Sequence, residues 1–142
     1  MIRFFGGRVM TLANGIETQD IEVWTEGSKI VFVGKPKAEE LDGKVFEREY
    51  DLKGNLLMPS FKNAHTHSAM TFLRSYADDM PLQDWLFKQI FPMEAKLDGE
   101  KVYWLTKLAI LEYLTTGCTA TFDMYFELDD YVKACIESGF RS

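Results

Sequence analysis

Short apolar runs separated by turn residues fill the first part of the chain. β-branched and aromatic residues dominate these runs, and each has the length of a single strand. The predicted strands are Ile2–Phe5, Val9–Leu12, Ile21–Thr25, Lys29–Val33 and Val45–Leu52. Gly27 predicts a hairpin between the third and fourth runs, and Asn14-Gly15 and Asp42-Gly43 are further turn dipeptides. The pattern predicts a small unit of antiparallel strands with a one-sided core.

Near Pro59 the pattern changes to strands that alternate with helices. The first strand is expected over Leu56–Met58 and Phe61–His67, and the next over Cys118–Met124. Phe140–Ser142 has the character of the first residues of a third strand. Parallel strands need long crossover connections, so this alternation predicts a parallel sheet covered by helices. It excludes a simple all-β fold for this half of the chain.

The longest predicted helix runs from about Glu100 to Thr116. Asp98 is suited to its N-cap and Gly117 to the position after its last turn. Apolar residues recur at steps of three or four and should face the core. These residues are Val102, Leu105, Ala109 and Tyr113.

Two further helical segments are expected. An amphipathic stretch covers Gln83–Phe91, within a long excursion after the first strand. Another helix should open at Asp129-Asp130 and close at Gly139. Its predicted inward residues are Val132, Cys135 and Ile136.

Composition and charge narrow the function classes. The chain has 142 residues, of which 46% are hydrophobic, enough for one domain with a real core. Its net charge of −6 and the lack of a basic cluster argue against nucleic-acid binding. No secretory signal opens the chain, no apolar run is long enough for a membrane span, and two cysteines are too few for a disulfide framework. We therefore expect a soluble, reduced, cytoplasmic protein with neither a nucleic acid nor a membrane as partner.

The chain contains only two histidines, His65 and His67, and they are two positions apart. Side chains at i and i+2 of a strand leave on the same face, so both imidazoles could reach one metal ion. Judged by spacing alone, two histidines without a shared role are an equally good interpretation. The surrounding sequence has to decide between them.

Several motifs around this pair carry a resemblance to a known family. Leu57–Phe61 leading into Asn63–His67 resembles the opening barrel strand of the metal-dependent amidohydrolase superfamily. Further segments resemble the subgroup that deaminates S-adenosylhomocysteine, methylthioadenosine and related adenosines. These segments are Ser68–Arg74, Tyr76–Asp79, Asp84–Leu86, Phe91–Glu94 and Gly117–Tyr125. One departure is Ser60, where many members carry glycine; we expect it to affect a turn and not the chemistry.

The resemblance implies a fold and a domain division. Residues 1–57 would form part of a small N-terminal β-sandwich, and residues 58–142 the first two βα units of a TIM-type (β/α)₈ barrel. Such a barrel takes about 250 residues, so the barrel here would be incomplete. The chain resembles the N-terminal third of an enzyme.

The resemblance also assigns roles to residues. His65 and His67 would be metal ligands, with zinc first and iron, nickel or manganese as alternatives. Metal-activated water would replace the exocyclic amine of an adenosine-like nucleoside. The later ligands and the proton shuttle lie on strands that this chain lacks, so no catalytic residue is expected within it and the isolated chain should be inactive.

Three more residues receive interpretations. Glu94 matches a family position that contacts ribose hydroxyls, and a carboxylate can accept two such hydrogen bonds. Trp85 could line the pocket against a flat purine ring, or could equally be a packing residue. Asp123 is expected to hydrogen-bond neighbouring loops and not to bind metal.

Alternatives remain within and outside this class. A chlorohydrolase, guanine deaminase or cytosine deaminase of the same superfamily is the first alternative. The cytidine-deaminase class is excluded, because it needs His-x-Glu and a Pro-Cys-x-x-Cys motif that the chain does not contain. The second alternative is a non-catalytic truncated product. Its open strand edges would then favour a homo-oligomer, including a domain-swapped one.

Overall fold

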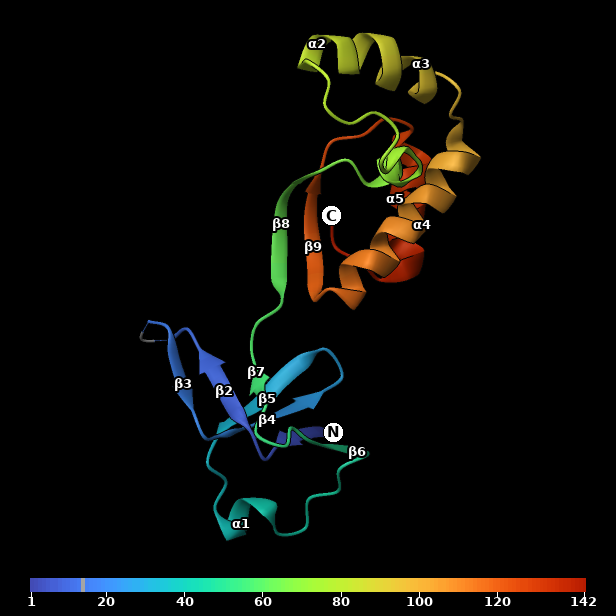
Figure 1. Ribbon diagram of the computed structural model, residues 1–142. Coiled ribbons are helices and arrows are strands. Elements are labelled where there is room, and N and C mark those ends of the chain that lie inside the picture. Colours follow the sequence, from blue (N-terminus) through green and yellow to red (C-terminus); the bar gives the residue numbers. More distant parts are fainter. Residues whose placement is uncertain (14) are drawn as a thin grey trace. The chain divides into compact units, whose positions relative to one another are not determined.

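The computed structural model describes residues 1–13 and 15–142, which divide into two compact units (Figure 1). The first unit is Met1–Pro59 and the second is Ser60–Ser142. The turn predicted at Asn14-Gly15 includes residue 14 and so falls outside the described residues. Among the described residues, no helix combines the length and the apolar character that crossing a bilayer requires.

Two small mixed sheets make up the first unit. One sheet has the strand order β5-β4-β1-β6 and the other has the order β3-β2-β7. The strands of the first sheet are β1 (Ile2–Phe5), β4 (Glu22–Glu26), β5 (Lys29–Gly34) and β6 (Arg48–Asp51). Those of the second are β2 (Arg8–Thr11), β3 (Glu17–Gln19) and β7 (Leu56–Leu57), and a short helix α1 (Ala38–Leu41) precedes β6. Val9, Val23 and Trp24 are the buried core residues of this unit.

The predicted hairpin is confirmed, but the expectation that all strands are antiparallel is wrong. β4 and β5 pair antiparallel around Gly27, whose φ of 56° suits glycine. In contrast, β1 pairs with β6 and β2 pairs with β7 in parallel. Hydrophobic alternation records which side chains face the core and carries no information on the direction of a distant partner. The predicted strand over Val45–Leu52 is also shorter, since Val45 is exposed and lies outside β6.

A shared corner connects the two sheets. Both β1 to β2 and β6 to β7 pass from the first sheet to the second, and the two connections are hydrogen-bonded to each other. The Gly54 amide donates to the Gly6 carbonyl at 2.7 Å, and the Arg8 amide donates to the Asn55 carbonyl at 3.0 Å. A Cβ on Gly7 would lie 2.4 Å from the Asn55 carbonyl oxygen, so no side chain fits there. The corner therefore requires glycine.

The predicted first strand of the second half is in fact two strands. Leu56 and Leu57 pair with β2 in the first unit, whereas β8 (Phe61–Thr66) pairs in parallel with β9 (Cys118–Asp123) in the second. Pro59, which cannot donate to a ladder, lies between them. Arg141 forms a parallel bridge with Ala120 of β9, as expected for the start of a third strand.

The helix α4 packs against this parallel pair, and α5 packs against α4. α4 (Gly99–Thr115) begins as predicted, with the Asp98 side chain accepting a hydrogen bond from the Lys101 amide at 3.0 Å. α5 (Leu128–Ser138) ends at Gly139, also as predicted. Their shared core consists of Ala69, Val102, Ile110, Tyr131, Cys135 and Phe140. The described strands and helices of the second unit form a βα region with one parallel strand pair and no closed barrel.

One facing prediction for α5 is wrong. Val132 is 46% exposed and Ile136 is 74% exposed, whereas Tyr131, Ala134 and Cys135 are buried. The helix carries apolar residues on two sides, so periodicity alone could not tell which side faces α4. With Leu128, the two exposed residues form an outward apolar stripe at steps of four.

A long helical excursion connects β8 to α4. It starts with a 3-10 segment η1 (Ser68–Leu73) and continues as one helix through α2 (Leu82–Asp84), a π-helical segment η2 (Trp85–Ile90) and α3 (Phe91–Glu94). The amphipathic helix predicted over Gln83–Phe91 is confirmed and extends further at both ends. Figure 1 shows α2 and α3 beyond the carboxyl ends of β8 and β9. His65 and Asp123 lie at these ends of the two strands.

Candidate functional site

The two histidine rings lie side by side at the carboxyl end of β8. His65 is the penultimate residue of β8, and His67 is the first residue after the strand. Their ring centroids are 5.0 Å apart and the ring planes are nearly perpendicular, at 89°. Two rings on opposite faces of a strand could not come this close. The i, i+2 argument from the sequence therefore describes the geometry correctly.

The backbone directly after β9 determines how His67 is oriented. Its Nδ1 atom lies 2.8 Å from the carbonyl oxygen of Met124. Because a carbonyl oxygen can only accept, Nδ1 carries the hydrogen in this contact. The neutral ring then presents its Nε2 lone pair away from the backbone. Metal-binding histidines commonly have this arrangement, in which the second nitrogen donates to a carbonyl or carboxylate.

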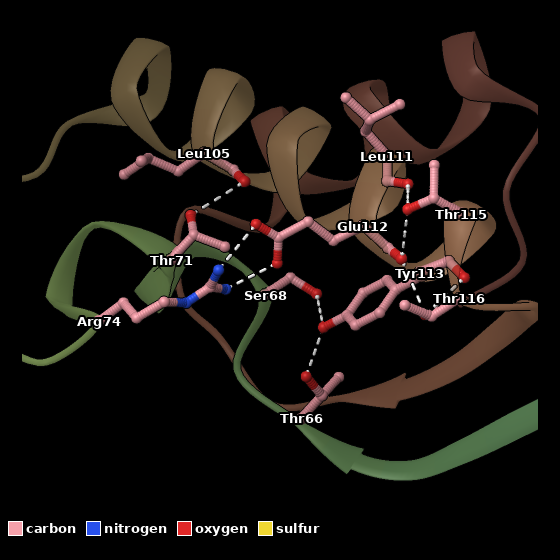
Figure 2. A network of polar contacts seen from close by, with 10 residues as sticks. All are labelled: Thr66, Ser68, Thr71, Arg74, Leu105, Leu111, Glu112, Tyr113, Thr115 and Thr116. Atoms are coloured by element: carbon pink, nitrogen blue, oxygen red, sulfur yellow. Dashed lines mark hydrogen bonds and ion pairs between the residues drawn. The ribbon is translucent and has the colours of Figure 1, made fainter.

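Polar contacts from α4 and β9 hold the segment on both sides of His67. The Tyr113 hydroxyl of α4 lies 2.5 Å from Thr66 Oγ1 and 3.1 Å from Ser68 Oγ, as Figure 2 shows. The Asp123 carboxylate accepts from the Ser68 amide at 3.2 Å and from the Ser68 hydroxyl. Asp123 therefore bonds a neighbouring loop, as expected. Two elements distant in sequence fix the backbone that carries the histidines.

The donor set for a metal is partial. Two imidazoles are suitable zinc ligands, but a catalytic zinc normally has at least three protein ligands. Within residues 1–13 and 15–142, no group of three histidine, cysteine or acidic side chains is placed to hold a metal ion. The Asp123 carboxylate, which lies next to the histidine segment, accepts hydrogen bonds from Ser68. The described residues thus fit part of a zinc site, and any complete site needs further ligands.

Trp85 and Glu94 reach the same end of the strands from the helical excursion. Trp85 lines a cavity of about 340 Å³ together with His67, and the ion pair of Arg74 with Glu112 (2.6 Å) borders it. Glu94 lies close to Tyr125, which follows β9. Burial raises the pKa of the Tyr125 phenol, and the carboxylates of Glu94 and Asp123 act in the same direction. The Tyr125 hydroxyl is buried and has no hydrogen-bond partner in the described part of the chain.

Some residues of this region were not identified as site residues from the sequence. Tyr113 was expected only as a core-facing residue of α4, yet its hydroxyl bonds the histidine segment. The Met124 carbonyl could not be inferred, because a backbone oxygen leaves no sequence signal. Ser68 is buried, and the sequence signal for it is its position directly after His67.

A comparison with protein-family models identifies the family of this chain. The model of the amidohydrolase family matches residues 56–141. This chain belongs to the amidohydrolase family. The match starts at β7 and runs through the histidine pair to the bridge at Arg141.

Among curated proteins, the chain is similar to deaminases of adenosine-type nucleosides. The chain is 43% identical over 120 residues to a 5-methylthioadenosine/S-adenosylhomocysteine deaminase of Desulfitobacterium hafniense, covering 84% of this chain and 28% of the relative. It is 55% identical over 92 residues to a 5'-deoxyadenosine deaminase of Methanospirillum hungatei, covering 65% of this chain and 20% of the relative. The chain thus spans about a quarter of the length of the relatives it matches.

A solved structure agrees with the fold. An adenosine deaminase from Xanthomonas campestris, with bound zinc, superposes with a TM-score of 0.90 at 34% identity. The superposition covers 99% of this chain and 32% of that one. The two described units therefore correspond to the N-terminal third of an amidohydrolase structure.

Proposed function

We propose that this chain is the N-terminal part of a metal-dependent aminohydrolase that deaminates adenosine-like nucleosides such as 5'-methylthioadenosine or S-adenosylhomocysteine. The observation that carries the proposal is the histidine pair, with rings 5.0 Å apart and the His67 Nδ1 atom satisfied by Met124. The names of the most similar relatives support the substrate class. The two unpaired cysteines fit a reducing compartment, so the proposal includes a cytoplasmic location.

His65 and His67 would hold the metal, together with ligands from outside the described residues. A bound zinc ion would supply a water molecule that is deprotonated near neutral pH. The remaining work of this chain is positioning. Met124 and Asp123 keep the histidine segment in one orientation, which preserves the ring geometry when a substrate binds.

Glu94 and Trp85 would bind the nucleoside. The Glu94 carboxylate can accept from both ribose hydroxyls, and the Trp85 ring can cover one face of the purine. Trp85 already lines the cavity next to His67. The division into a β-sandwich part at residues 1–57 and barrel units at 58–142 belongs to the same proposal.

Two variants of this function are distinguished by substrate. A guanine deaminase, cytosine deaminase or chlorohydrolase of the same family would act on bases or ring compounds without ribose. A Glu94→Gln change in an enzyme that includes the whole barrel should then affect only the nucleoside reaction. We expect it to raise KM for 5'-methylthioadenosine about tenfold or more and to leave the KM for a free base unchanged.

Metal binding by this chain is the direct test. Because the chain has only two histidines, a titration with zinc can be followed on the imidazole signals alone. We expect His65→Ala and His67→Ala each to abolish zinc-dependent shifts of the remaining ring, and a Cys135→Ser control to retain them. Shifts that persist in both histidine variants would refute the ligand assignment. In an enzyme with the complete barrel, His65→Ala should stop ammonia release from 5'-methylthioadenosine.

We also propose that this chain self-associates. Phe122 of β9 is 78% exposed and Met124, just after the strand, is 67% exposed, and α5 exposes its stripe of Leu128, Val132 and Ile136. Apolar surface of this extent is rarely left open in a monomer. A homo-oligomer, including one formed by exchange of strands at the open edge of β8, would cover this surface. Sedimentation velocity that shows a folded monomer at micromolar concentration would contradict this.

A further inference from the structure

The helical excursion follows a repeat of four residues and not the α-helical repeat of 3.6. Its exposed positions fall in pairs, and from Phe87 on the step between pairs is four residues: Leu82-Gln83, Phe87-Lys88, Phe91-Pro92 and Ala95-Lys96. Its more buried positions fall in pairs at the same step, which are Trp85-Leu86, Gln89-Ile90 and Met93-Glu94. In a regular α-helix, a step of four drifts by about 40° each time, so such a pattern would wind around the helix. Here the step of four residues is kept twice in succession, and the half-buried pairs stay on one side.

The cause of the longer repeat is η2. At its end, the Phe91 amide donates to the Leu86 carbonyl, which is the i→i−5 bond of a π-turn. The backbone is regular α-helix on both sides, with the Trp85 amide bonded to Pro81 and the Ala95 amide bonded to Phe91. The π-turn thus holds one residue more than an α-helical turn would.

Pro92 disturbs the helix at this turn. Proline has no amide hydrogen, so the Lys88 carbonyl loses its α-helical donor, and the proline ring would collide with that carbonyl in a regular helix. Widening the preceding turn relieves the collision, and the Phe91 amide there donates to the Leu86 carbonyl in place of its α-helical acceptor, the Phe87 carbonyl. Pro92 belongs to the Phe91–Glu94 motif of the sequence.

The turn decides where Trp85 and Glu94 point. Nine steps separate them (94 − 85), which in an α-helix is about two and a half turns and places them on opposite sides. The π-turn accommodates one extra residue, so the rotation from Trp85 to Glu94 equals that of about eight α-helical residues. The two side chains then point in directions roughly 80° apart around the helix axis. Both side chains are in fact half-buried on the inner side, Trp85 beside His67 and Glu94 beside Tyr125.

We infer that Pro92 is a positioning residue, whose π-turn brings Trp85 and Glu94 to the same side of the excursion so that one nucleoside can contact both. This inference rests on the proposed function, because it assumes that these two residues bind the substrate. Phe87 and Phe91, which pack edge to face with centroids 5.3 Å apart, keep the opposite side.

The test compares two variants of the chain. Pro92→Ala permits a regular α-helix and should rotate Glu94 by about 100° relative to Trp85. Deleting Lys88 from that variant removes the extra residue and should restore their relation in a helix without a π-turn. Lys88 is exposed, so its deletion removes no core contact.

Nuclear Overhauser contacts between Glu94 and the Tyr125 ring give the readout. We expect them in the wild-type chain, loss of them in Pro92→Ala, and their return when Lys88 is also deleted. Contacts that persist in Pro92→Ala, or that stay absent in the deletion variant, would overturn the role of Pro92. A merely structural role would not predict the rescue.

Adding 5'-methylthioadenosine separates this inference from the proposed function. Signals of Trp85 and Glu94 should shift in the wild type and in the deletion variant and should stay unshifted in Pro92→Ala. If the contacts follow the expected pattern while the nucleoside shifts no signal in any protein, the substrate assignment is refuted and the π-turn assignment is supported.

Discussion

The Tyr113 hydroxyl joins α4 to the histidine segment through two contacts, and removing it should lower the free energy of unfolding. Tyr113→Phe keeps the ring, which stacks on Phe140 with centroids 5.7 Å apart, so the packing of the core is preserved. The change deletes the contacts to Thr66 at 2.5 Å and to Ser68 at 3.1 Å. Figure 2 shows that both contacts converge on this one oxygen.

The expected loss follows from these two bonds. Each contributes about 0.5–1.5 kcal/mol net, which gives about 1–3 kcal/mol in the free energy of unfolding. Ser68 keeps its bonds to Asp123, whereas Thr66 Oγ1 is left without this partner, so the upper half of the range is favoured. Urea unfolding followed by far-ultraviolet circular dichroism, which reports mainly on α4 and α5, measures the change.

Tyr103→Phe is the matched control on the same helix. Its hydroxyl bonds the Glu137 carboxylate on the exposed surface, so we expect its removal to cost within about 0.5 kcal/mol. If Tyr113→Phe destabilises the chain no more than this control does, the hydroxyl does not hold the histidine segment and the reasoning is wrong.

Three further predictions follow from charges and burial. The Arg3 guanidinium, 2.6 Å from Glu22, lowers the pKa of that carboxyl, so the pair stabilises the fold above the unfolded value of about 4.3 and this contribution is lost as pH falls through the lowered pKa. Glu22→Gln should therefore flatten the loss of unfolding free energy below about pH 4.3 in acid titrations, and an unchanged slope would contradict the pairing. Asp123→Asn should weaken zinc binding by this chain about 10–100-fold without changing its circular dichroism, whereas Asp129→Asn on the exposed start of α5 should not; equal affinities would refute the positioning role. Burial raises the pKa of the Cys135 thiol, so iodoacetamide should modify it only in unfolded protein, as mass spectrometry can show.

Local features of the fold could be predicted from the sequence. The cap at Asp98, the helix end at Gly117 and the hairpin at Gly27 each depend on a few consecutive residues, and all three are confirmed. The parallel pairing of β1 with β6 depends on residues far apart in the chain, and the local pattern gave no sign of it. β3, with three exposed polar residues, offers no alternation to detect.

The candidate site shows the same division. The relation of His65 to His67 follows from strand geometry and was predictable. Their support was not, because Tyr113 and the Met124 carbonyl reach His67 and its neighbours through space from other elements. The π-turn could be predicted only in part. Pro92 marks the perturbation in the sequence, but the choice of a widened turn over a kink or a helix end is made by the packing of the excursion.

The two parallel pairings that meet at the shared corner, β1 with β6 and β2 with β7, affect how the first unit folds during synthesis. The hairpin of β4 and β5 and its pairing with β1 can form once about thirty residues have left the ribosome, whereas β1 waits for β6, and β2 for β7, until residues 48–57 emerge. Closing such a long loop is entropically costly and slows folding compared with a simple hairpin. The edges of β1 and β2 thus remain available to other nascent chains for that interval, which makes slow translation at this point a risk for aggregation.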